Sequence, residues 1–360
     1  ARRNVQLLQS GSECERWLWS FIVEQTRLHY QPIYERLHVK LTRQDERGES
    51  FYNLFLADVV HALREKGLAV DSEGAVAVFI DGRDKPPVIV EKTGGGYLYA
   101  TTDLAALRYR AQELHANWII YTHDSRQAQH FNQVFRIARE AGFVPPDVRL
   151  DYAPFGTMLG EDGKPFKTRS GDTVKLKDLL DEAEARALKL VTEKNPELPE
   201  QQRNDIARAV GIGAVKYADL SKDRTSDYLF SWDKMLAMDG NTAPYLQYAY
   251  ARIKSIFRKS GGMPALAGGL ELGTPYELSL AKHVLRLGEV IDLVARELKP
   301  HHLTNYLYEL ATKFSSFYEN CPVLQSDEPT RSSRLLLCDV TARTMATGLG
   351  LLGIEHPEQM

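Results

Sequence analysis

Long apolar runs are missing from the 360-residue sequence. No stretch approaches the roughly 20 apolar residues that a helix needs to cross a bilayer. The first residues also lack the charged and then apolar pattern of a secretory signal. These absences predict a cytoplasmic protein with no membrane partner.

Cysteine is scarce, and the sequence contains only Cys14, Cys321 and Cys338. They are odd in number and far apart. None belongs to a CxxC pair or lies near a histidine at zinc-ligand spacing. We therefore predict reduced, packed thiols, with no zinc and no metal site made by the protein alone.

An excess of charge of one sign is also missing, because 45 Lys and Arg residues oppose 48 Asp and Glu residues, for a net charge of -3. Such a chain has no general attraction for a polyanion, so any RNA contact must be local. Basic residues cluster at 252–259 and at 164–177. A solvated basic face explains either cluster equally well.

Apolar residues make up 43% of the chain, which is enough for a large core and predicts two domains. The opening segment ARRNVQLLQSG has no methionine and resembles the interior of a charged helix. It predicts that the chain starts in the middle of a larger protein. A processed amino terminus is the alternative.

Helical periodicity covers residues 5–38, where large apolar residues alternate with charged ones. Short runs that are rich in β-branched or aromatic residues follow, separated by glycine and proline, and predict strands. These runs are residues 75–80, 88–92 and 97–101.

Helix and strand patterns then alternate, with Gly142 as a helix stop. The helix patterns are residues 104–115 and 127–142, and the strand patterns are residues 118–123 and 148–159. This alternation predicts a parallel α/β sheet. Ligands of such sheets bind at the carboxyl ends of the strands, which points to residues 101–103 and 122–126.

From Leu179 onward the pattern predicts helices in place of strands, with two apolar stripes. One stripe is Leu278, Ala281, Leu285, Gly288, Asp292 and Ala295. The other stripe is Leu303, Leu307, Leu310, Phe314 and Phe317.

The segment GNTAPYLQYAYAR, residues 240–252, predicts a helix that Asn241 and Thr242 can cap. Three residues then recur on one side of it at three- and four-residue spacing: Tyr245, Tyr248 and Arg252. Rings beside a cation can stack bases. An ordinary bundle helix shows the same spacing, which by itself favours core packing.

The amino-acid sequence of this segment resembles the start of the anticodon-binding domain of arginyl-tRNA synthetases, which are class I enzymes. Further stretches extend the resemblance over nearly the whole chain. They are GESFYN (48–53), AVGIGAVKYADLS (209–221), RTSDYLFSWDKM (224–235) and GLLGIEHPEQM (350–360).

The resemblance implies an α/β region followed by an all-α region. Residues 1–238 would form a partial Rossmann-type, parallel-sheet catalytic domain with a helical stem at about 178–238, and residues 239–360 a helical-bundle anticodon-binding domain. It further implies that arginine and ATP, with Mg²⁺ bound to the ATP, form arginyl-adenylate, from which arginine passes to tRNA(Arg). Members of the family are usually monomers, and as a group they need bound tRNA to activate the amino acid.

Tyr99 and Asp103 are expected at the mouth of a cleft, where a strand passes into a helix. A carboxylate there can bind a guanidinium through two parallel charge-assisted hydrogen bonds, a geometry that lysine cannot reproduce. Spacing alone favours a simpler role for Asp103 as a helix cap. The resemblance favours substrate binding, because the matching Tyr and Asp of the family contact the arginine side chain.

The segment HDSRQAQHF, residues 123–131, follows a predicted strand and enters a helix. Its amide hydrogens point toward a bound anion or ribose. Asp124 and His130 are candidates for binding ATP, and Gln127 for the amino acid. Alternatively, Asp124 or Ser125 caps the helix and the other residues are solvated. A zinc site is disfavoured because the histidines lack partners at ligand spacing.

The glycine-containing loop at residues 159–176 carries Lys164, Lys167 and Arg169. Positioned cations stabilise the charge that builds on departing pyrophosphate, so all three are catalytic candidates and Lys167 is also a candidate for ATP binding. The resemblance places this loop where class I synthetases have the KMSKS signature. Its KPFKTR sequence departs from that signature, which leaves open which cation meets the phosphates. An exposed, solvated hairpin is the alternative.

The resemblance also places the last helices and the terminal residue beside the anticodon. Tyr245, Tyr248, Arg252 and Met360 are therefore the candidate tRNA-binding residues.

Class I synthetases carry a HIGH-type motif at the first helix of the nucleotide fold, and no HxGH sequence occurs in this chain. The amino-terminal tRNA-contacting domain of the family is not represented either. The chain thus resembles the part downstream of the motif, and by itself it is expected to make no arginyl-adenylate. One alternative is a non-catalytic RNA-binding or regulatory relative. Another is a different class I enzyme such as the cysteinyl synthetase. That enzyme ordinarily uses zinc, and the low number of cysteines in this chain argues against it.

Overall fold

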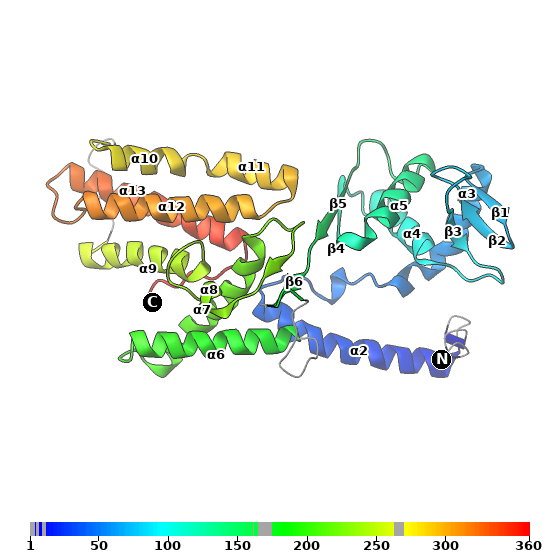
Figure 1. Ribbon diagram of the computed structural model, residues 1–360, viewed down its shortest axis with the longest axis horizontal. Helices are drawn as coiled ribbons and strands as arrows, with labels where there is room; N and C mark the ends of the chain where they lie inside the picture. Colours follow the sequence, from blue (N-terminus) through cyan, green and yellow to red (C-terminus); the bar gives the residue numbers. More distant parts are fainter. Residues whose placement is uncertain (1–3, 5–6, 9–11, 161, 165–174, 263–269) are drawn as a thin grey trace. The chain divides into compact units, whose positions relative to one another are not determined.

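The computed structural model describes residues 1–360 except 1–3, 5–6, 9–11, 161, 165–174 and 263–269 (Figure 1). Contacts divide the chain into two compact units. The α/β unit is Thr42–Thr157, and the helical unit combines Ala1–Leu41 with Met158–Met360. This division differs from the domain boundary predicted near residue 238, which stays a prediction. Among the described residues, no helix has the length and apolar character to cross a bilayer.

The α/β unit begins with short helical turns, a helix and a three-stranded antiparallel sheet. In chain order these are η1 (Arg43–Asp45), η2 (Glu49–Phe55), α3 (Leu56–Glu65), β1 (Ala69–Ser72), β2 (Ala75–Val78) and β3 (Val88–Glu91). The strands follow one another in the order β1-β2-β3. Two of the three predicted strands are thus confirmed, at residues 75–80 and 88–92.

The third predicted strand, at residues 97–101, is wrong. Tyr97 makes only an isolated bridge to Glu91, and α4 (Tyr99–Gln112) begins two residues later. Thr101 is fully buried and donates a hydrogen bond to the carbonyl of Val90 on β3. This tertiary contact fixes the first turn of the helix and overrides the local preference for extended structure.

The predicted alternation of helix and strand is confirmed in the rest of this unit. β4 (Trp118–Asp124) leads through η3 (Ser125–Gln127) into α5 (Ala128–Glu140), and β5 (Arg149–Phe155) follows. β4 and β5 pair in parallel along their whole length. Gly142 has a left-handed φ of 66° just beyond α5, which confirms it as a helix stop. The core beneath these elements includes fully buried Leu104, Val134 and Ile137.

The helical unit contains α2 (Glu13–Arg36), α6 (Leu176–Lys194), α7 (Glu200–Leu220), α8 (Trp232–Met235) and a bundle. The bundle consists of α9 (Ala243–Ser260), α10 (Pro275–Val284), α11 (Leu287–Glu297), α12 (His301–Asn320) and α13 (Thr330–Leu351). Strands do not cease as predicted, because β6 (Met158–Leu159) pairs in parallel with β7 (Tyr228–Leu229). α6 and α7 pack closely, and a Cβ on Gly211 would lie 2.7 Å from the carbonyl oxygen of Ala183.

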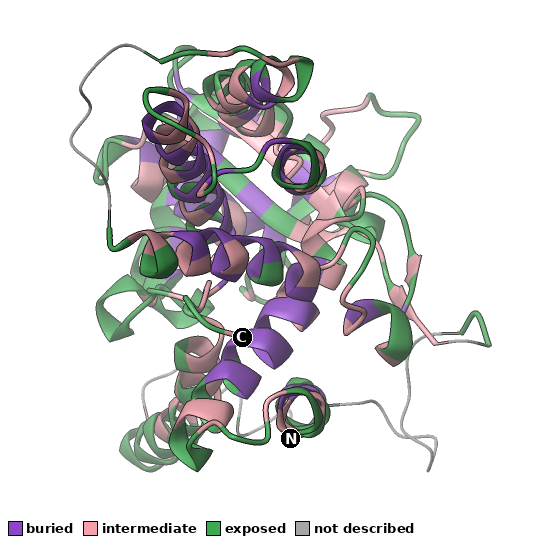
Figure 2. Ribbon diagram, turned by 90° about the vertical axis from the view of Figure 1, so that its left-hand side faces the viewer, coloured by how far each residue is buried: buried purple, intermediate pink, exposed green. Residues whose placement is uncertain are grey.

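The bundle core confirms one of the two predicted stripes. Leu303, Leu307, Leu310, Phe314 and Phe317 are all buried on α12, which contacts α9, α10, α11 and α13. Figure 2 shows the buried residues of the bundle on the sides where its helices face one another. The other stripe is wrong, because α10 ends at Val284, α11 begins at Leu287 and Leu285 between them is 82% exposed.

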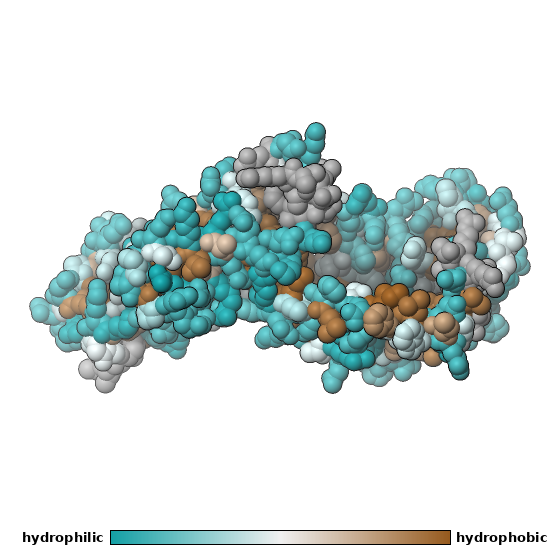
Figure 3. Space-filling view, turned by 90° about the horizontal axis from the view of Figure 1, so that it is seen from below, coloured by the Kyte–Doolittle hydropathy of each residue, from teal (hydrophilic) through white to brown (hydrophobic). Residues whose placement is uncertain are grey.

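Helix α2 differs from the bundle, since none of its residues is buried. Figure 3 shows hydrophobic side chains along it on the surface of the molecule.

Candidate active site and nucleic-acid interface

The first turns of α4 carry the candidate arginine-binding residues. Leu98 precedes the helix in an extended conformation and contributes no side-chain cap. Tyr99 and Asp103 lie within the helix four residues apart, a spacing that places both side chains on one face. Tyr99 is 70% exposed. Asp103 lies in the second turn, so the expectation that it caps the helix is wrong.

Asp103 pairs with His130 of α5, and the distance between Oδ2 and Nε2 is 2.6 Å. The side chains are about one-quarter and one-third exposed, so solvent reaches the pair. His130 engages one carboxylate oxygen, and Oδ1 can accept hydrogen bonds from a ligand. The structure thus joins two candidate residues that the sequence assigned to different ligands.

Asp124, at the end of β4, is the cap of η3. Its carboxylate accepts hydrogen bonds from the Arg126 backbone NH at 2.9 Å and from the Arg126 guanidinium at 2.7 and 2.9 Å. These bonds, with the side-chain contact the strongest, lower the pKa of Asp124 to about 2. The capping role considered for Asp124 is therefore present, and its contact with ATP stays a prediction.

An aromatic cluster supports the loop that follows β4, and the sequence reasoning did not identify it. The ring of buried Phe131 lies 4.6 Å from His123 and 5.3 Å from Tyr152 between centroids. The Tyr152 hydroxyl donates a hydrogen bond to the Asp124 carbonyl at 2.5 Å. The cluster thus contacts the backbone of the loop through Tyr152, whereas the side chain of Gln127 is exposed.

Of the three candidate phosphate-binding cations, the structure describes Lys164. Lys164 is exposed and sits in a tight turn, in which Gly163 has a φ of 70° and the Gly160 NH donates to the Lys164 carbonyl at 2.8 Å. Lys167 and Arg169 lie outside the described residues.

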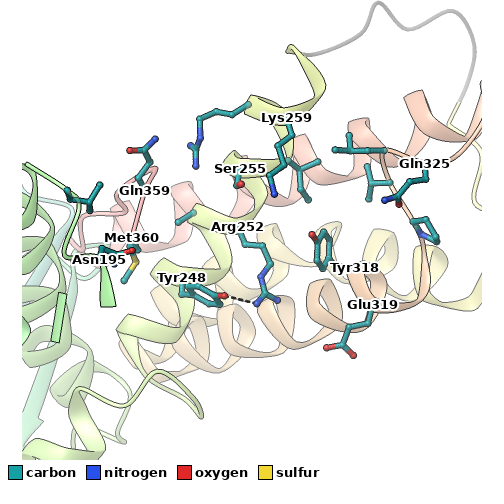
Figure 4. Close-up of a pocket in the computed structure, with 17 residues that line it drawn as sticks. Asn195, Tyr248, Arg252, Ser255, Lys259, Tyr318, Glu319, Gln325, Gln359 and Met360 are labelled. Atoms are coloured by element: carbon teal, nitrogen blue, oxygen red, sulfur yellow. Dashed lines mark hydrogen bonds between the residues drawn. The ribbon is translucent and has the colours of Figure 1, made fainter. Parts of the chain in front are cut away.

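The candidate tRNA residues of α9 begin with a capped helix. The Thr242 side chain accepts a hydrogen bond from the Tyr245 NH, which confirms the predicted cap. Arg252 donates to the Tyr248 hydroxyl at 2.9 Å, and its guanidinium lies 4.7 Å from the Tyr248 ring centroid and 5.6 Å from that of Tyr318 (Figure 4). A cation between two rings offers both charge and stacking surface.

These side chains line a cavity of about 840 Å³. Tyr248, Arg252 and Met360 all contribute to its wall, and so do the cations Arg258 and Lys259 (Figure 4). The cavity therefore brings together three of the four candidate tRNA residues from opposite ends of the bundle sequence.

Tyr245 is not part of this cavity. Its ring lies 5.8 Å from that of Tyr308, and its hydroxyl is 3.5 Å from Ser315 Oγ. The ring is partly buried against the bundle core. Tyr245 thus makes core contacts of the kind that the alternative expected, and its contact with tRNA stays a prediction.

Gln247 holds the last residues of the chain in place. It is fully buried, and its Nε2 donates to the carbonyl of Ala209 on α7 at 2.9 Å and to that of Glu355 at 2.7 Å. Arg258 donates to the Glu358 carbonyl at 2.9 Å. Met360 packs against the apolar contact between α6 and α7. The sequence reasoning missed Gln247, although an amide on the buried face of an apolar helix was a usable signal.

No group of three or more His, Cys, Asp or Glu side chains that could hold a metal ion is found within the part of the chain that the structure describes. The absence of zinc remains a prediction.

Comparison with known proteins identifies the family. Residues 1–232 match the family of tRNA synthetases class I (R), catalytic domain, and residues 246–360 match the DALR anticodon binding domain. The chain belongs to the class I arginyl-tRNA synthetase family. Its fold class is accordingly that of a class I catalytic region with a parallel sheet, followed by a helical anticodon-binding domain.

Curated relatives of the chain include arginine--tRNA ligases of two bacteria. The arginine--tRNA ligase of Cellvibrio japonicus is 54% identical over 369 residues, covering 100% of this chain and 64% of that protein. The arginine--tRNA ligase of Azotobacter vinelandii is 56% identical, covering 100% of this chain and 63% of that protein. The chain thus spans less than two thirds of the length of these relatives.

Solved structures agree on the fold. Arginyl-tRNA synthetase from Plasmodium falciparum is 31% identical with a TM-score of 0.88, covering 99% of this chain and 61% of that one. The Thermus thermophilus arginyl-tRNA synthetase is 26% identical with a TM-score of 0.83, covering 99% and 65% respectively.

Proposed function

We propose that this chain provides the arginine-binding and tRNA-binding parts of an arginine--tRNA ligase that works as a cytoplasmic monomer. In the first step the carboxylate of arginine attacks the α-phosphate of ATP, which forms arginyl-adenylate and releases pyrophosphate. In the second step tRNA(Arg) takes the arginine and AMP leaves. Family membership and the 54% identity to a curated ligase support this proposal.

The pairing of Asp103 with His130 is the observation that carries the proposal. It leaves a carboxylate oxygen available on the same helix face as exposed Tyr99. Each charge-assisted hydrogen bond to a guanidinium contributes roughly 1.5–3 kcal/mol. Asp103 would bind the guanidinium and Tyr99 would pack beside it, while His130 orients the carboxylate. We assign Gln127 to the amino-acid end of the substrate and Asp124 and His130 to the ATP side.

The phosphate chemistry is assigned to the basic loop. Lys164, Lys167 and Arg169 would stabilise the charge that develops on pyrophosphate. Mg²⁺ would arrive with ATP, since this ion keeps several waters and commonly binds through substrate phosphates. We expect that Lys167→Ala in the intact enzyme slows adenylate formation much more than it weakens arginine binding. Equal losses in both would contradict the assignment.

The tRNA contact is assigned to the cavity of the helical unit. Tyr248 and Arg252 offer a ring and a cation, Met360 closes one wall, and Arg258 and Lys259 supply local positive charge. Local charge is necessary because the whole chain has a net charge of -3. Tyr245 stays a candidate for tRNA outside this cavity, with its ring packed against Tyr308.

Charging of tRNA(Arg) by an intact enzyme that contains this sequence tests the proposal. Arginine should be attached in an ATP-dependent reaction, whereas citrulline, which lacks the cationic fork, should not compete at equal concentration. Citrulline bound as tightly as arginine would refute the role of Asp103.

The isolated chain gives a second test. Because no HxGH sequence is present among its 360 residues, we expect no arginine-dependent exchange of pyrophosphate into ATP, with or without tRNA. Measurable exchange would contradict that expectation. An intact enzyme that binds tRNA but charges it with no amino acid would favour a non-catalytic RNA-binding relative.

A further inference from the structure

The loop between α7 and β7, residues 221–227, is attached to the bundle by a side-chain contact and a backbone contact. Asp223 accepts a hydrogen bond from Lys299 Nζ at 2.6 Å, and Arg224 Nε donates to the carbonyl of Leu298 at 2.6 Å. Leu298 and Lys299 lie in the corner between α11 and α12. Two neighbouring residues of the loop thus bind two neighbouring residues of the corner, and these two contacts form a clamp inside the helical unit.

The loop side of the clamp is ordered by its own hydrogen bonds. The Asp223 carboxylate also accepts from the Thr225 NH at 3.1 Å and from the Thr225 hydroxyl at 2.8 Å. The hydrogen bond from Lys299 is the largest cause that lowers the pKa of Asp223 below its ordinary value of 3.8, so the pair is ionised at neutral pH. The side chains of Lys299 and Asp223 are 29% and 34% exposed. Salt screens a partly buried pair of this kind less than a pair on the open surface.

The corner side of the clamp is fixed as well. Leu298 has a φ of 56°, in the left-handed region that a bulky residue seldom adopts. Such a conformation persists where the surrounding contacts hold it. Across the corner, His302 Nε2 of α12 lies 2.8 Å from Glu297 Oε2 of α11. The carbonyl that accepts from Arg224 therefore belongs to a backbone whose direction is set by the bundle.

The loop leads into β7, and β7 holds the segment that carries Lys164. β7 pairs with β6, and the Phe230 NH donates to the carbonyl of Leu159 at 2.8 Å. The residue after β6 is Gly160, whose NH donates to the carbonyl of Lys164 at 2.8 Å. The turn that presents Lys164 thus starts where the pairing of β6 with β7 ends.

The pairing of β6 with β7 is too short to hold itself in place. Each strand has two residues, and an isolated pair of strands is only marginally stable in water. On one side of β7, Phe230 is 4% exposed and packs with Leu179, Ala214 and Met235. On the other side the chain reaches the clamp. Apolar packing therefore restrains the end of β7, and the clamp restrains its approach.

We propose that Asp223, Arg224 and Lys299 are positioning residues for the phosphate step, because the clamp fixes β7, β7 fixes β6, and β6 fixes the turn that presents Lys164. The inference rests on the proposed function, which assigns Lys164 to the charge that develops on pyrophosphate. In this role the three residues act through Lys164 and not by contact with a substrate. A misplacement of about 1 Å caused far from the chemistry can lower a rate roughly 100-fold, so loss of the clamp should be visible in kcat.

Hydrogen–deuterium exchange of the intact enzyme, followed by mass spectrometry, tests the positioning without any substrate. In Lys299→Met we expect about fivefold faster hydrogen exchange in the peptides that contain Gly160 or Phe230, because their amide hydrogen bonds open more often. Lys299→Arg retains the ion pair and should match the unaltered enzyme. Arg343→Met removes an ion pair to Asp339 within α13 and is the control, with no change expected. Unchanged hydrogen exchange of both peptides in Lys299→Met would overturn the inference.

Kinetics separates positioning from a merely structural role. Arginine-dependent pyrophosphate exchange by Lys299→Met should show kcat lowered about tenfold per active site, with the KM for arginine and the tRNA(Arg) affinity within about twofold. Lys299→Arg should restore kcat. Asp223→Asn removes the charge from the other side of the pair and should reproduce both effects, which keeps the test open if Lys299→Met does not fold. Equal changes in kcat and in both binding measurements would indicate general damage and overturn the inference.

A double-mutant cycle with Lys164→Ala tests whether Lys299 acts through the turn. If it does, the variant with both changes should be no slower than Lys164→Ala alone. Losses in kcat that multiply would show that Lys299 acts by another route and would overturn the inference. Faster hydrogen exchange at Gly160 with an unaltered kcat would instead refute the role of Lys164 in the proposed function, while the clamp would stand.

Discussion

The candidate arginine site of the α/β unit and the candidate tRNA cavity of the helical unit hold their side chains in different ways. Asp103 is oriented by its place on α4 and by one contact, to His130, and both side chains remain accessible to solvent. In the cavity, Arg252 contacts the rings of Tyr248 and Tyr318, and several hydrogen bonds fasten the chain segment that ends at Met360.

This difference is consistent with the two proposed ligands. A guanidinium is small and charged, so one carboxylate in the correct place supplies most of the discrimination. A nucleic acid is contacted over a wide surface by rings and cations that each contribute modestly. Single substitutions should therefore cost more at the first site than at the second.

Asp103→Asn should have the largest effect. The amide loses the negative charge but keeps the shape, and we expect kcat/KM for arginine to fall about 100-fold, or about 2.7 kcal/mol. Arginine-dependent pyrophosphate exchange by the intact enzyme measures it. Asp147→Asn, an exposed carboxylate of the same unit, is the control and should change nothing. An unaltered KM for arginine in Asp103→Asn would remove the assignment.

Tyr248→Ala should weaken tRNA binding without affecting arginine binding. Loss of a stacking ring costs about 1–3 kcal/mol, so tRNA(Arg) affinity should fall roughly tenfold or more while the KM for arginine stays constant. Filter binding with the tRNA transcript measures the affinity. Tyr276→Ala, at an exposed ring on α10 outside the cavity, is the matched control. Equal tRNA affinity in both variants would assign Tyr248 to packing alone.

Gln247→Leu should destabilise the helical unit and displace the end of the chain. The substitution removes the donor from the carbonyls of Ala209 and Glu355, and a lost buried partner costs about 1–3 kcal/mol. Urea unfolding measures this cost, and tRNA binding should weaken by about threefold through Met360. Gln201→Leu, at an exposed position of α7, is the control. Full stability with Gln247→Leu would show that the segment is held by other contacts.

Acid should weaken the helical unit by a small amount through Glu277. Burial alone would raise the pKa of Glu277, but hydrogen bonds from Arg334 and Thr274 outweigh it and lower the pKa below the ordinary 4.5. The unfolded chain therefore takes up this proton first as the pH falls, so the stabilisation is present above pH 4.5 and is lost through the lower, folded pKa. Urea unfolding between about pH 3 and pH 6 measures this loss of stability. A Glu277→Gln variant with the same acid sensitivity as the unaltered chain would exclude this source.

Features that depend on neighbouring residues were predictable. Thr242 caps α9 because its side chain reaches an NH three residues on, and Gly142 stops α5 because glycine tolerates a positive φ. The α12 stripe from Leu303 to Phe317 follows helical periodicity and is fully buried as expected. The resemblance to the family was likewise recognised from short sequence motifs, which are local features.

Features that depend on packing were not predictable. Residues 97–101 have the composition of a strand, yet Thr101 bonds to Val90 and lies in α4. Leu285 fits a helical stripe, yet the chain turns there and leaves it exposed. Periodicity carries no information about a contact made with another element, so it could not distinguish these cases.

Local sequence was thus sufficient for the family, for the alternation of helices and strands from α4 to β5, and for the residue types at each candidate site. Only the tertiary structure determined which of these residues contact one another. Asp103 touches His130 although 27 positions separate them, and Met360 shares a cavity with Arg252, whereas Tyr245 does not. Such contacts arise when whole elements pack, because packing is decided by the summed burial of many side chains and not by the pattern around any one of them.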